Sequence, residues 1–268
     1  MNPSDPVESM PALPDDDPWL ALRRFTHARI ALGRVGNGLP TRAQLAFELA
    51  HAQARDAVHA SLDTPGLCTM LQDAGFATLQ VHSAASDRAE YLRRPDLGRR
   101  LHAASAASLD DYANRLDCRP DLLFVVADGL SAHAAARHAL PVLLAARAQR
   151  PELRLGPVVV ARQARVALGD DIGERLQARL VAVMLGERPG LSSPDSLGIY
   201  LTHAPRRGCS DAQRNCISNV RPQGLAYEIA AFKLCHLVSR ALELGLTGVA
   251  LKDDSDRLAD HTGPGTVA

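Results

Sequence analysis

Several features that mark other protein classes are missing from this sequence of 268 residues. It has no apolar run of transmembrane length, and its N-terminus lacks a basic flank followed by an apolar core, so it predicts neither a membrane span nor a signal peptide. The five cysteines are odd in number and irregularly spaced, which argues against a disulfide framework and for reduced thiols. These absences predict an intracellular, cytoplasmic protein.

An excess of charge of either sign is also missing. Thirty Lys and Arg residues balance thirty Asp and Glu residues, so no net field recruits nucleic acid or an anionic membrane. Hydrophobic residues make up 46% of the chain, enough for a sizeable core in one large domain, or in one domain with an attached helical segment. We therefore expect a globular protein that binds neither nucleic acid nor membrane.

The sequence contains no motif of a self-sufficient active site. No CxxC or HExxH pairing is present, and the Cys and His spacing fits no zinc finger, so no metal site is predicted. Ser131 follows an apolar strand, but no GxSxG elbow surrounds it. Gly33, Gly36 and Gly38 lack the GxGxxG spacing and indicate a turn. No catalytic residue is predicted in this chain.

Composition divides the chain into three stretches. Residues 1–18 are rich in Pro, Asp and Ser and lack periodicity, which predicts a disordered arm. Residues 19–115 are rich in Ala, Arg and Leu, with Leu45 and Leu49 at helical spacing, so this stretch is expected to be mostly helix. In residues 116–268, short β-rich runs alternate with amphipathic segments, a pattern typical of an α/β domain.

The third stretch predicts an open sheet. Strands are expected at 122–127, 157–161, 180–185 and 197–203, with helices between them and a long helix from about 225 to 244 that Gly245 ends. Because right-handed crossovers align parallel strands, Asp128, the 162–169 loop and Glu187 should share one rim. The predicted fold class is α/β, a Rossmann-like open parallel sheet with a helical N-terminal segment.

Each polar residue at this rim has a ligand-binding and a structural interpretation. Glu187 precedes a Pro-Gly turn, where its carboxylate could bind a ligand or the loop's own N–H groups, or pair with Arg188 or Arg206. Cys216, in the string NCISNVRP, could contact a ligand or pack as a small hydrophobe. Asp128 could bind a ligand or cap the turn that follows its strand. The pattern leaves these alternatives open.

Several separate motifs point to one family. They are GERPGL at 186–191, NCISNVRP at 215–222 and LTGVALKD at 246–253, preceded by ARIALGRVGNGLPTRAQLAFELAHAQARDAVH at 28–59, YLRRPDLGRRL at 91–101 and VVADGLSAHAA at 125–135. In this order they resemble the small (light) subunit of ethanolamine ammonia-lyase, the adenosylcobalamin-dependent enzyme of ethanolamine breakdown. Several motifs in one order are more specific than any single short pattern. The resemblance spans nearly the whole chain after its first two dozen residues.

The resemblance implies a function and a set of site residues. It implies a subunit, inactive alone, that helps to bind adenosylcobalamin at the interface with a large catalytic subunit, in an enzyme that converts ethanolamine to acetaldehyde and ammonia. Val166, Glu187 and Cys216 match family residues that contact the cofactor. The DxHxxG signature that supplies a histidine to cobalt in other cobalamin domains is missing. We therefore expect base-on binding, with the cofactor's own dimethylbenzimidazole on the metal.

Partners and location follow from the same resemblance. Family members form hexamers of large–small pairs, and the basic run at 91–100 is either a solvated face or a contact with the large subunit. In some relatives an N-terminal arm targets a bacterial microcompartment. Two other classes stay open. One is a stand-alone nucleotide-dependent enzyme, for which ADGLSAH at 127–133 is a poor phosphate loop. The other is a non-catalytic nucleotide-binding or scaffold subunit of another enzyme complex, which as a scaffold would bury its rim in a partner.

Overall fold

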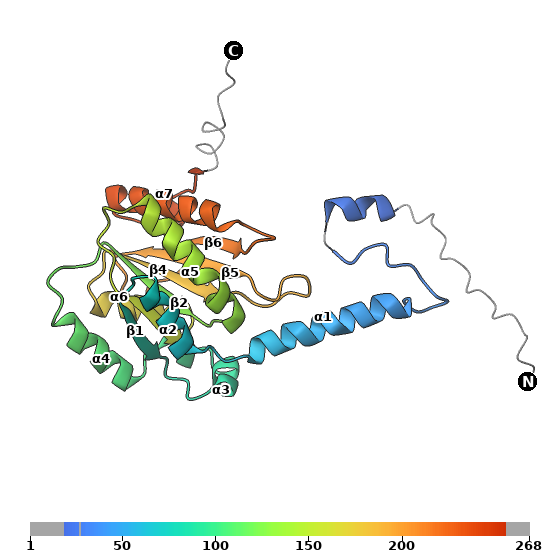
Figure 1. Ribbon diagram of the computed structural model, residues 1–268, viewed down its shortest axis with the longest axis horizontal. Helices are drawn as coiled ribbons and strands as arrows, with labels where there is room; N and C mark the ends of the chain where they lie inside the picture. The colour runs from blue at the N-terminus through green and yellow to red at the C-terminus, as the bar shows by residue number, and fades with distance from the viewer. Residues whose placement is uncertain (1–18, 27, 256–268) are drawn as a thin grey trace, which may run out of the picture. The chain divides into compact units, whose positions relative to one another are not determined.

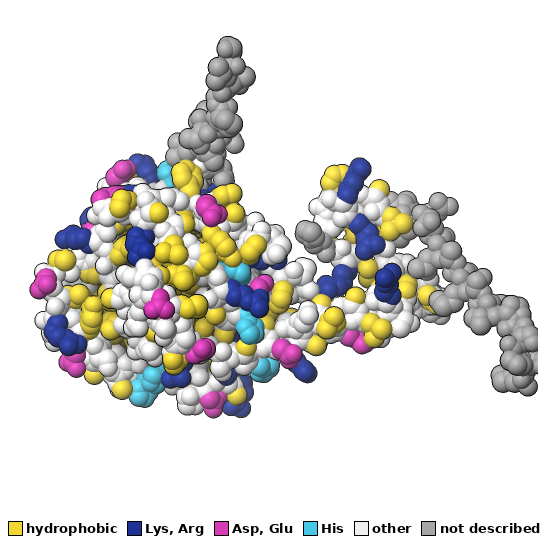
Figure 2. Space-filling model, in the orientation of Figure 1, with side chains coloured by type: hydrophobic (Ala, Val, Ile, Leu, Met, Phe, Trp, Pro, Cys, Tyr) yellow, Lys and Arg dark blue, Asp and Glu magenta, His cyan; other side chains and the backbone are white. Residues whose placement is uncertain are grey.

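The computed structural model describes residues 19–26 and 28–255, so the predicted arm 1–18 lies outside the described residues. These residues belong to two compact units, divided between Gln53 and Ala54. Within the described ranges, no helix has the length and apolarity that crossing a bilayer requires. Figure 2 shows basic and acidic side chains interspersed over the visible face of the second unit, in keeping with the balanced charge of the sequence.

The first unit is small and exposes much of its apolar surface. It contains the 3-10 helix η1 (Leu20–Phe25), a turn, and most of α1 (Thr41–His59). At the turn, Val35 and Gly38 exchange backbone hydrogen bonds of 3.0 and 3.1 Å, which confirms the turn predicted from the glycines. Leu45 and Leu49 lie on α1 at helical spacing, but they are 59% and 60% exposed. Although Ala50 is buried, this unit therefore leaves most of its large apolar side chains exposed.

The second unit is built on a six-stranded sheet of order β1-β3-β2-β4-β5-β6 (Figure 1). Its strands are β1 (Thr78–His82), β2 (Leu122–Ala127), β3 (Val158–Arg162), β4 (Leu180–Gly186), β5 (Leu197–His203) and β6 (Arg214–Val220). Strands β1 to β4 are parallel, and β5 is antiparallel to both of its neighbours. The four predicted strands are confirmed within a residue at each end, and the fold is mixed α/β with a mostly parallel sheet.

Helices cover this sheet and connect its strands. They are α2 (Thr64–Asp73), α3 (Arg88–Arg93), α4 (Ala103–Ala113), α5 (Ala132–Gln149), α6 (Leu168–Arg175) and α7 (Tyr227–Leu244), with the 3-10 turns η2 (Leu97–Arg99), η3 (Asp211–Gln213) and η4 (Gly248–Ala250). Helix α7 ends at Gly245, whose φ of 70° is in the left-handed region that glycine adopts without strain. The predicted end of this helix is confirmed.

The helices form one layer on each face of the sheet. Side chains of α2, α5 and α7 share one core cluster with Leu122, Phe124 and Val126, whereas α4 and α6 pack against the opposite face, with Leu123 and Val125. In the strand order β3-β2-β4, the connection from β2 to β3 leads towards one edge of the sheet, and the connection from β3 to β4 leads towards the other edge. Right-handed crossovers therefore put α5 and α6 on opposite faces. Neighbouring β2 and β3 form a switch point, where ligands bind in open α/β sheets.

Strands β1 and β6 were not predicted. Strand β1 lies inside the 19–115 stretch, where we expected mostly helix, and its sequence TLQVH has only Leu79 and Val81 as apolar residues. Strand β6, with the sequence RNCISNV, buries Ile217 and Val220 on one face and exposes Cys216 and others on the opposite face. Both lie at edges of the sheet. Edge strands need fewer apolar residues than central ones, so their signal in the sequence is weak.

Candidate functional site

The carboxyl ends of β2, β3 and β4 meet at one rim, as predicted. Ala127 pairs with Ala161 of β3 and with Leu185 of β4, so the residues that follow these strands emerge side by side. Asp128 and Glu187 therefore lie at the same edge of the sheet, together with the loop that leads into α6. This is the edge where parallel α/β sheets place their ligands.

Glu187 is bound to the end of β6 rather than to an arginine. Its carboxylate accepts the backbone N–H of Asn219 at 3.2 and 3.3 Å, and its own N–H donates to Ser196 at 2.9 Å. Within residues 28–255 it forms no ion pair with Arg188 or Arg206. Among the described residues, the carboxylate thus binds an N–H of β6 rather than the N–H groups of its own loop, and it keeps further lone pairs for a ligand.

Tyr200 connects Glu187 to Cys216. A Cβ atom on Gly198 would lie 3.0 Å from Glu187 Oε1 and 3.1 Å from Tyr200 Cε2, so both side chains close over this glycine. Tyr200 pairs with Cys216 across β5 and β6. Burial raises the pKa of the Tyr200 hydroxyl, and the neighbouring Cys216 and Glu187 add to the rise. Desolvation by surrounding atoms likewise raises the pKa of the Cys216 thiol. Both groups stay protonated at neutral pH.

Val166 lies at the start of α6 on the same side of the sheet. It is half-buried and packs, like Tyr200, against the core cluster under α4 and α6. Its carbonyl accepts the N–H of Gly169 at 3.0 Å. Within the described part of the chain, the N–H groups of Val166 and Ala167 have no acceptor in reach. The structure thus puts the three predicted site residues on one side of the sheet, with two free backbone donors beside them.

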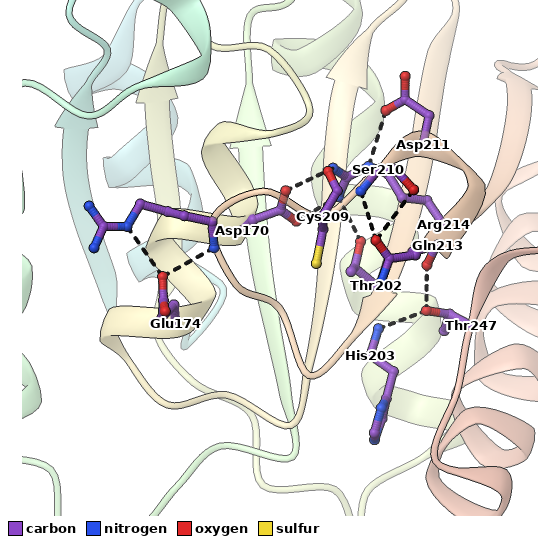
Figure 3. Close-up of polar contacts among 11 residues, drawn as sticks. Asp170, Glu174, Thr202, His203, Cys209, Ser210, Asp211, Gln213, Arg214 and Thr247 are labelled. Atoms are coloured by element: carbon purple, nitrogen blue, oxygen red, sulfur yellow. Dashed lines mark hydrogen bonds and ion pairs between the residues drawn. The ribbon is translucent and has the colours of Figure 1, made fainter.

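A buried ion pair fixes α6 against the strand that carries Cys216 (Figure 3). Arg214 donates to both carboxylate oxygens of Asp170 at 2.5 and 2.7 Å, and to the Thr202 hydroxyl at 3.1 Å. The two charged side chains are only 1% and 2% exposed. Burial raises the pKa of the Asp170 carboxyl, and the Arg214 hydrogen bonds oppose that rise. Because Arg214 and Cys216 are two residues apart on β6, the pair fixes the position of Cys216 relative to α6.

Asp128 supports the loop before Val166. It is only 3% exposed. Its carboxylate accepts hydrogen bonds from the backbone N–H groups of Gln163 and Ala164, at 2.8 and 3.1 Å, and from Arg88 Nη1 at 3.2 Å. Gln163 has a φ of 54°, a left-handed conformation that is costly for a residue with a side chain. Asp128 therefore has a structural role, because its oxygens bind the protein, but they hold the loop after β3 and Arg88 rather than only the turn that follows its own strand.

A separate cavity of about 960 Å³ lies between α4 and α6. It is lined by Ala167 and Arg175, among others, but not by Val166, Glu187 or Cys216. Arg175 is neutralised within it by Asp110 and Asp171, at 2.6 and 2.8 Å. Among the described residues, no group of three or more His, Cys, Asp or Glu side chains could hold a metal ion.

Sequence reasoning missed Gly198, Tyr200 and Asn219. The alternation in LGIYLTH does put Gly198 and Tyr200 on one face of their strand. It could not show that this face is open next to Cys216, because β6 itself was not predicted. No pattern pointed to Asn219, whose contact with Glu187 uses its backbone.

The fold and the site define an α/β protein with a polar site at the carboxyl rim of its sheet and on the adjoining open face of β5 and β6. Residues 16–252 match the family model described as Ethanolamine ammonia-lyase light chain (EutC). The chain belongs to this family.

Proteins named ethanolamine ammonia-lyase small subunit resemble the chain over most of its length. The protein from Ralstonia nicotianae is 53% identical over 255 residues, which cover 94% of each chain. One from Pseudomonas putida KT2440 is 54% identical over 243 residues, covering 90% of this chain and 89% of its own. Another, from Pseudomonas syringae pv. tomato DC3000, is 54% identical over 241 residues, covering 89% and 84%.

Proposed function

We propose that this chain is the small subunit of an adenosylcobalamin-dependent carbon–nitrogen lyase that converts ethanolamine to acetaldehyde and ammonia. In this proposal the chain helps to bind the cofactor at its interface with a large catalytic subunit and is inactive alone. Family membership supports the reaction. The observation that carries the cofactor-binding role is the convergence of Glu187 and Cys216 on Tyr200, on the side of the sheet where Val166 also lies.

The groups at this site fit the periphery of a corrin, which carries amide side chains. The Glu187 carboxylate can accept amide N–H bonds, and the free N–H groups of Val166 and Ala167 can donate to amide carbonyls. Cys216, protonated at neutral pH, suits a packing contact rather than a bond to cobalt, because the thiolate is the metal ligand. Base-on binding agrees with this donor set. When bound, the cofactor supplies radical chemistry by cobalt–carbon homolysis, and this chain's residues hold and orient it.

The partner proposed for this chain is the large subunit, in a hexamer of large–small pairs. The 19–115 segment is proposed to contact it, because α1 exposes apolar side chains that the first unit does not bury. The sheet, of which all strands but β1 lie in the predicted 116–268 domain, is proposed to be Rossmann-like in how it presents its rim to the cofactor. A cytoplasmic location, within a bacterial microcompartment in some relatives, is part of the same proposal.

Co-expression with the candidate large subunit tests this function. Ammonia release from ethanolamine with added adenosylcobalamin is measured for each chain alone and for the mixture, and corrin absorbance is measured after gel filtration. Activity and retained corrin only in the mixture are the expected results. A mixture that forms a complex but neither releases ammonia nor retains corrin contradicts the proposal, and the rim is then screened against nucleotides.

A further inference from the structure

Arg165, next to Val166, has a guanidinium without a protein partner. Its guanidinium carbon lies 4.5 Å from the centroid of the Tyr91 ring, and its Nε is buried with no hydrogen-bond acceptor. Within residues 19–26 and 28–255 it forms no ion pair. The Nη1 and Nη2 atoms also form no hydrogen bond with the described residues. Because only Nε is both buried and unpartnered, Nη1 and Nη2 are exposed to solvent. The two outer nitrogens can therefore donate to a ligand, whereas Nε is buried.

The position of Arg165 is fixed by its surroundings. Its backbone N–H donates to Gly98 at 2.8 Å, and the Tyr91 hydroxyl donates to the Ala164 carbonyl at 3.0 Å. A Cβ on Gly98 would lie 3.0 Å from Arg165 Cγ, so the arginine stem passes over a glycine. A side chain held in this way loses little conformational entropy when its outer nitrogens bind a ligand.

Asp128, an acidic side chain near Tyr91, forms no ion pair with Arg165. Asp128 acts on the same tyrosine, but its oxygens are bound to Arg88 Nη1 and to the N–H groups of Gln163 and Ala164. Arg88 also packs on the Tyr91 ring, at 4.9 Å. Two guanidinium groups and one carboxylate therefore gather at the switch point between β2 and β3, which leaves one positive charge uncompensated.

We infer that Arg165 binds the phosphodiester of the cofactor's nucleotide tail, an inference that rests on the proposed function. This phosphodiester is the anionic group of adenosylcobalamin, whose other side chains are neutral amides. Its two free oxygens match the Nη1 and Nη2 donors of a guanidinium, which binds phosphate in a bidentate manner. The N–H groups of Val166 and Ala167, proposed above to donate to corrin amide carbonyls, lie within two residues of this arginine, so one loop would contact both the amides and the phosphodiester.

Three corrinoids that differ in the tail test this assignment on the assembled large–small complex. They are adenosylcobalamin, adenosylcobinamide phosphate, which keeps a phosphate but lacks the base, and adenosylcobinamide, which lacks both. Equilibrium dialysis followed by corrin absorbance gives the dissociation constants. Arg165→Ala should weaken binding of the two phosphate-bearing corrinoids about tenfold, the size of one charged hydrogen bond, and that of adenosylcobinamide less than about twofold. Arg165→Lys keeps the positive charge but loses the two parallel N–H donors of the guanidinium, so its dissociation constants for the phosphate-bearing corrinoids should lie between those of the unmodified complex and of Arg165→Ala.

Arg162→Ala is the matched control, because Arg162 is an exposed arginine at the end of β3, just before this loop, and has no ion pair among the described residues. It should leave all three dissociation constants within about twofold. An equal loss for all three corrinoids in Arg165→Ala would overturn the inference in favour of a structural role, and unchanged binding would also overturn it. Loss of subunit assembly instead would indicate a carboxylate of the large subunit as the partner. If the unmodified complex bound none of the three, the proposed function itself would fail.

Discussion

The carboxylate of Glu187 accepts the backbone N–H of Asn219 at 3.2 Å, which joins the turn after β4 to the end of β6. Asn219 has a φ of 59°, in the left-handed region where asparagine is better tolerated than most residues. Two sequence motifs that resemble the same family, GERPGL and NCISNVRP, thus meet through one hydrogen-bonded carboxylate. Glu187 therefore has both a structural contact and a proposed contact with the cofactor.

Replacing Glu187 by alanine should weaken retention of adenosylcobalamin by the large–small complex about tenfold, because a charged acceptor is lost from the proposed site. Glu187→Gln, which keeps an acceptor oxygen, should lose less. Dialysis of the loaded complex, followed by corrin absorbance, measures the effect. Glu243→Ala, at an exposed position on α7, is the control. Loss of assembly with unchanged cofactor affinity would contradict the assignment of Glu187.

Gly198→Ala should reduce cofactor affinity several-fold while the chain stays folded. The new methyl group would meet Glu187 Oε1 at 3.0 Å and Tyr200 Cε2 at 3.1 Å, so both side chains must move. Overpacking of this kind typically costs about 1–3 kcal/mol of stability. Urea unfolding and corrin binding are measured together. Gly190→Ala is the matched control, since its nearest atom would be 3.7 Å away. Equal effects of the two substitutions on corrin binding would show that Gly198 has no special role.

Asp170→Asn should lower the free energy of unfolding by up to about 3–5 kcal/mol, because it leaves the buried Arg214 charge with only the exposed Asp211, at 3.3 Å, as a carboxylate partner. Chemical denaturation measures this loss. Asp96→Asn breaks an exposed pair with Arg94 and should leave the denaturation midpoint unchanged. The double variant Asp170→Leu with Arg214→Met should recover part of the stability. A single variant as stable as the unmodified chain would show that the pair does not hold α6 in place.

Stability should fall in mild acid because of His138. Burial lowers the pKa of this imidazole from its usual 6.5, although nearby Asp195 opposes the shift. The unfolded chain then binds a proton at a higher pH than the folded chain does. The contribution of His138 is therefore complete above pH 6.5 and is lost as the pH falls through that value towards the lowered pKa of the folded state.

Unfolding curves at about pH 8 and pH 5.5 measure the effect of His138, since these values bracket the ordinary imidazole pKa. His138→Gln should reduce the difference in unfolding free energy between the two pH values. His59→Gln removes an exposed imidazole and should leave that difference as it is. If His138→Gln also left it unchanged, the pH dependence would have to come from other groups.

The exposed apolar side chains of α1 should be needed for assembly. Leu45→Ser combined with Leu49→Ser should reduce co-elution with the large subunit, because both side chains are more than half exposed in the chain itself. Circular dichroism should remain that of the folded chain. Ile229→Ser, at a 50% exposed position on α7, is the control. Unchanged co-elution of the double variant would place the subunit contact elsewhere in the proposed 19–115 segment.

Much of the fold was predictable because it depends on local patterns. Five or more consecutive apolar residues, as in 122–127 and 180–185, are satisfied in a strand buried on both faces. Helix α7 has an apolar face at helical spacing and a glycine just past its end, so its course could be predicted as well. The edge strands β1 and β6 could not, because each has few buried apolar side chains.

By itself, the sequence determined the class of the fold, the central strands and the family, since buried runs and ordered motifs are properties of neighbouring residues. Only the tertiary structure decided that Asp128 supports a loop, that Glu187 reaches Asn219, and that Arg165 is left without a partner. These contacts join residues far apart in the chain. They depend on strand order and on which helix covers which face, and neither is specified by local periodicity.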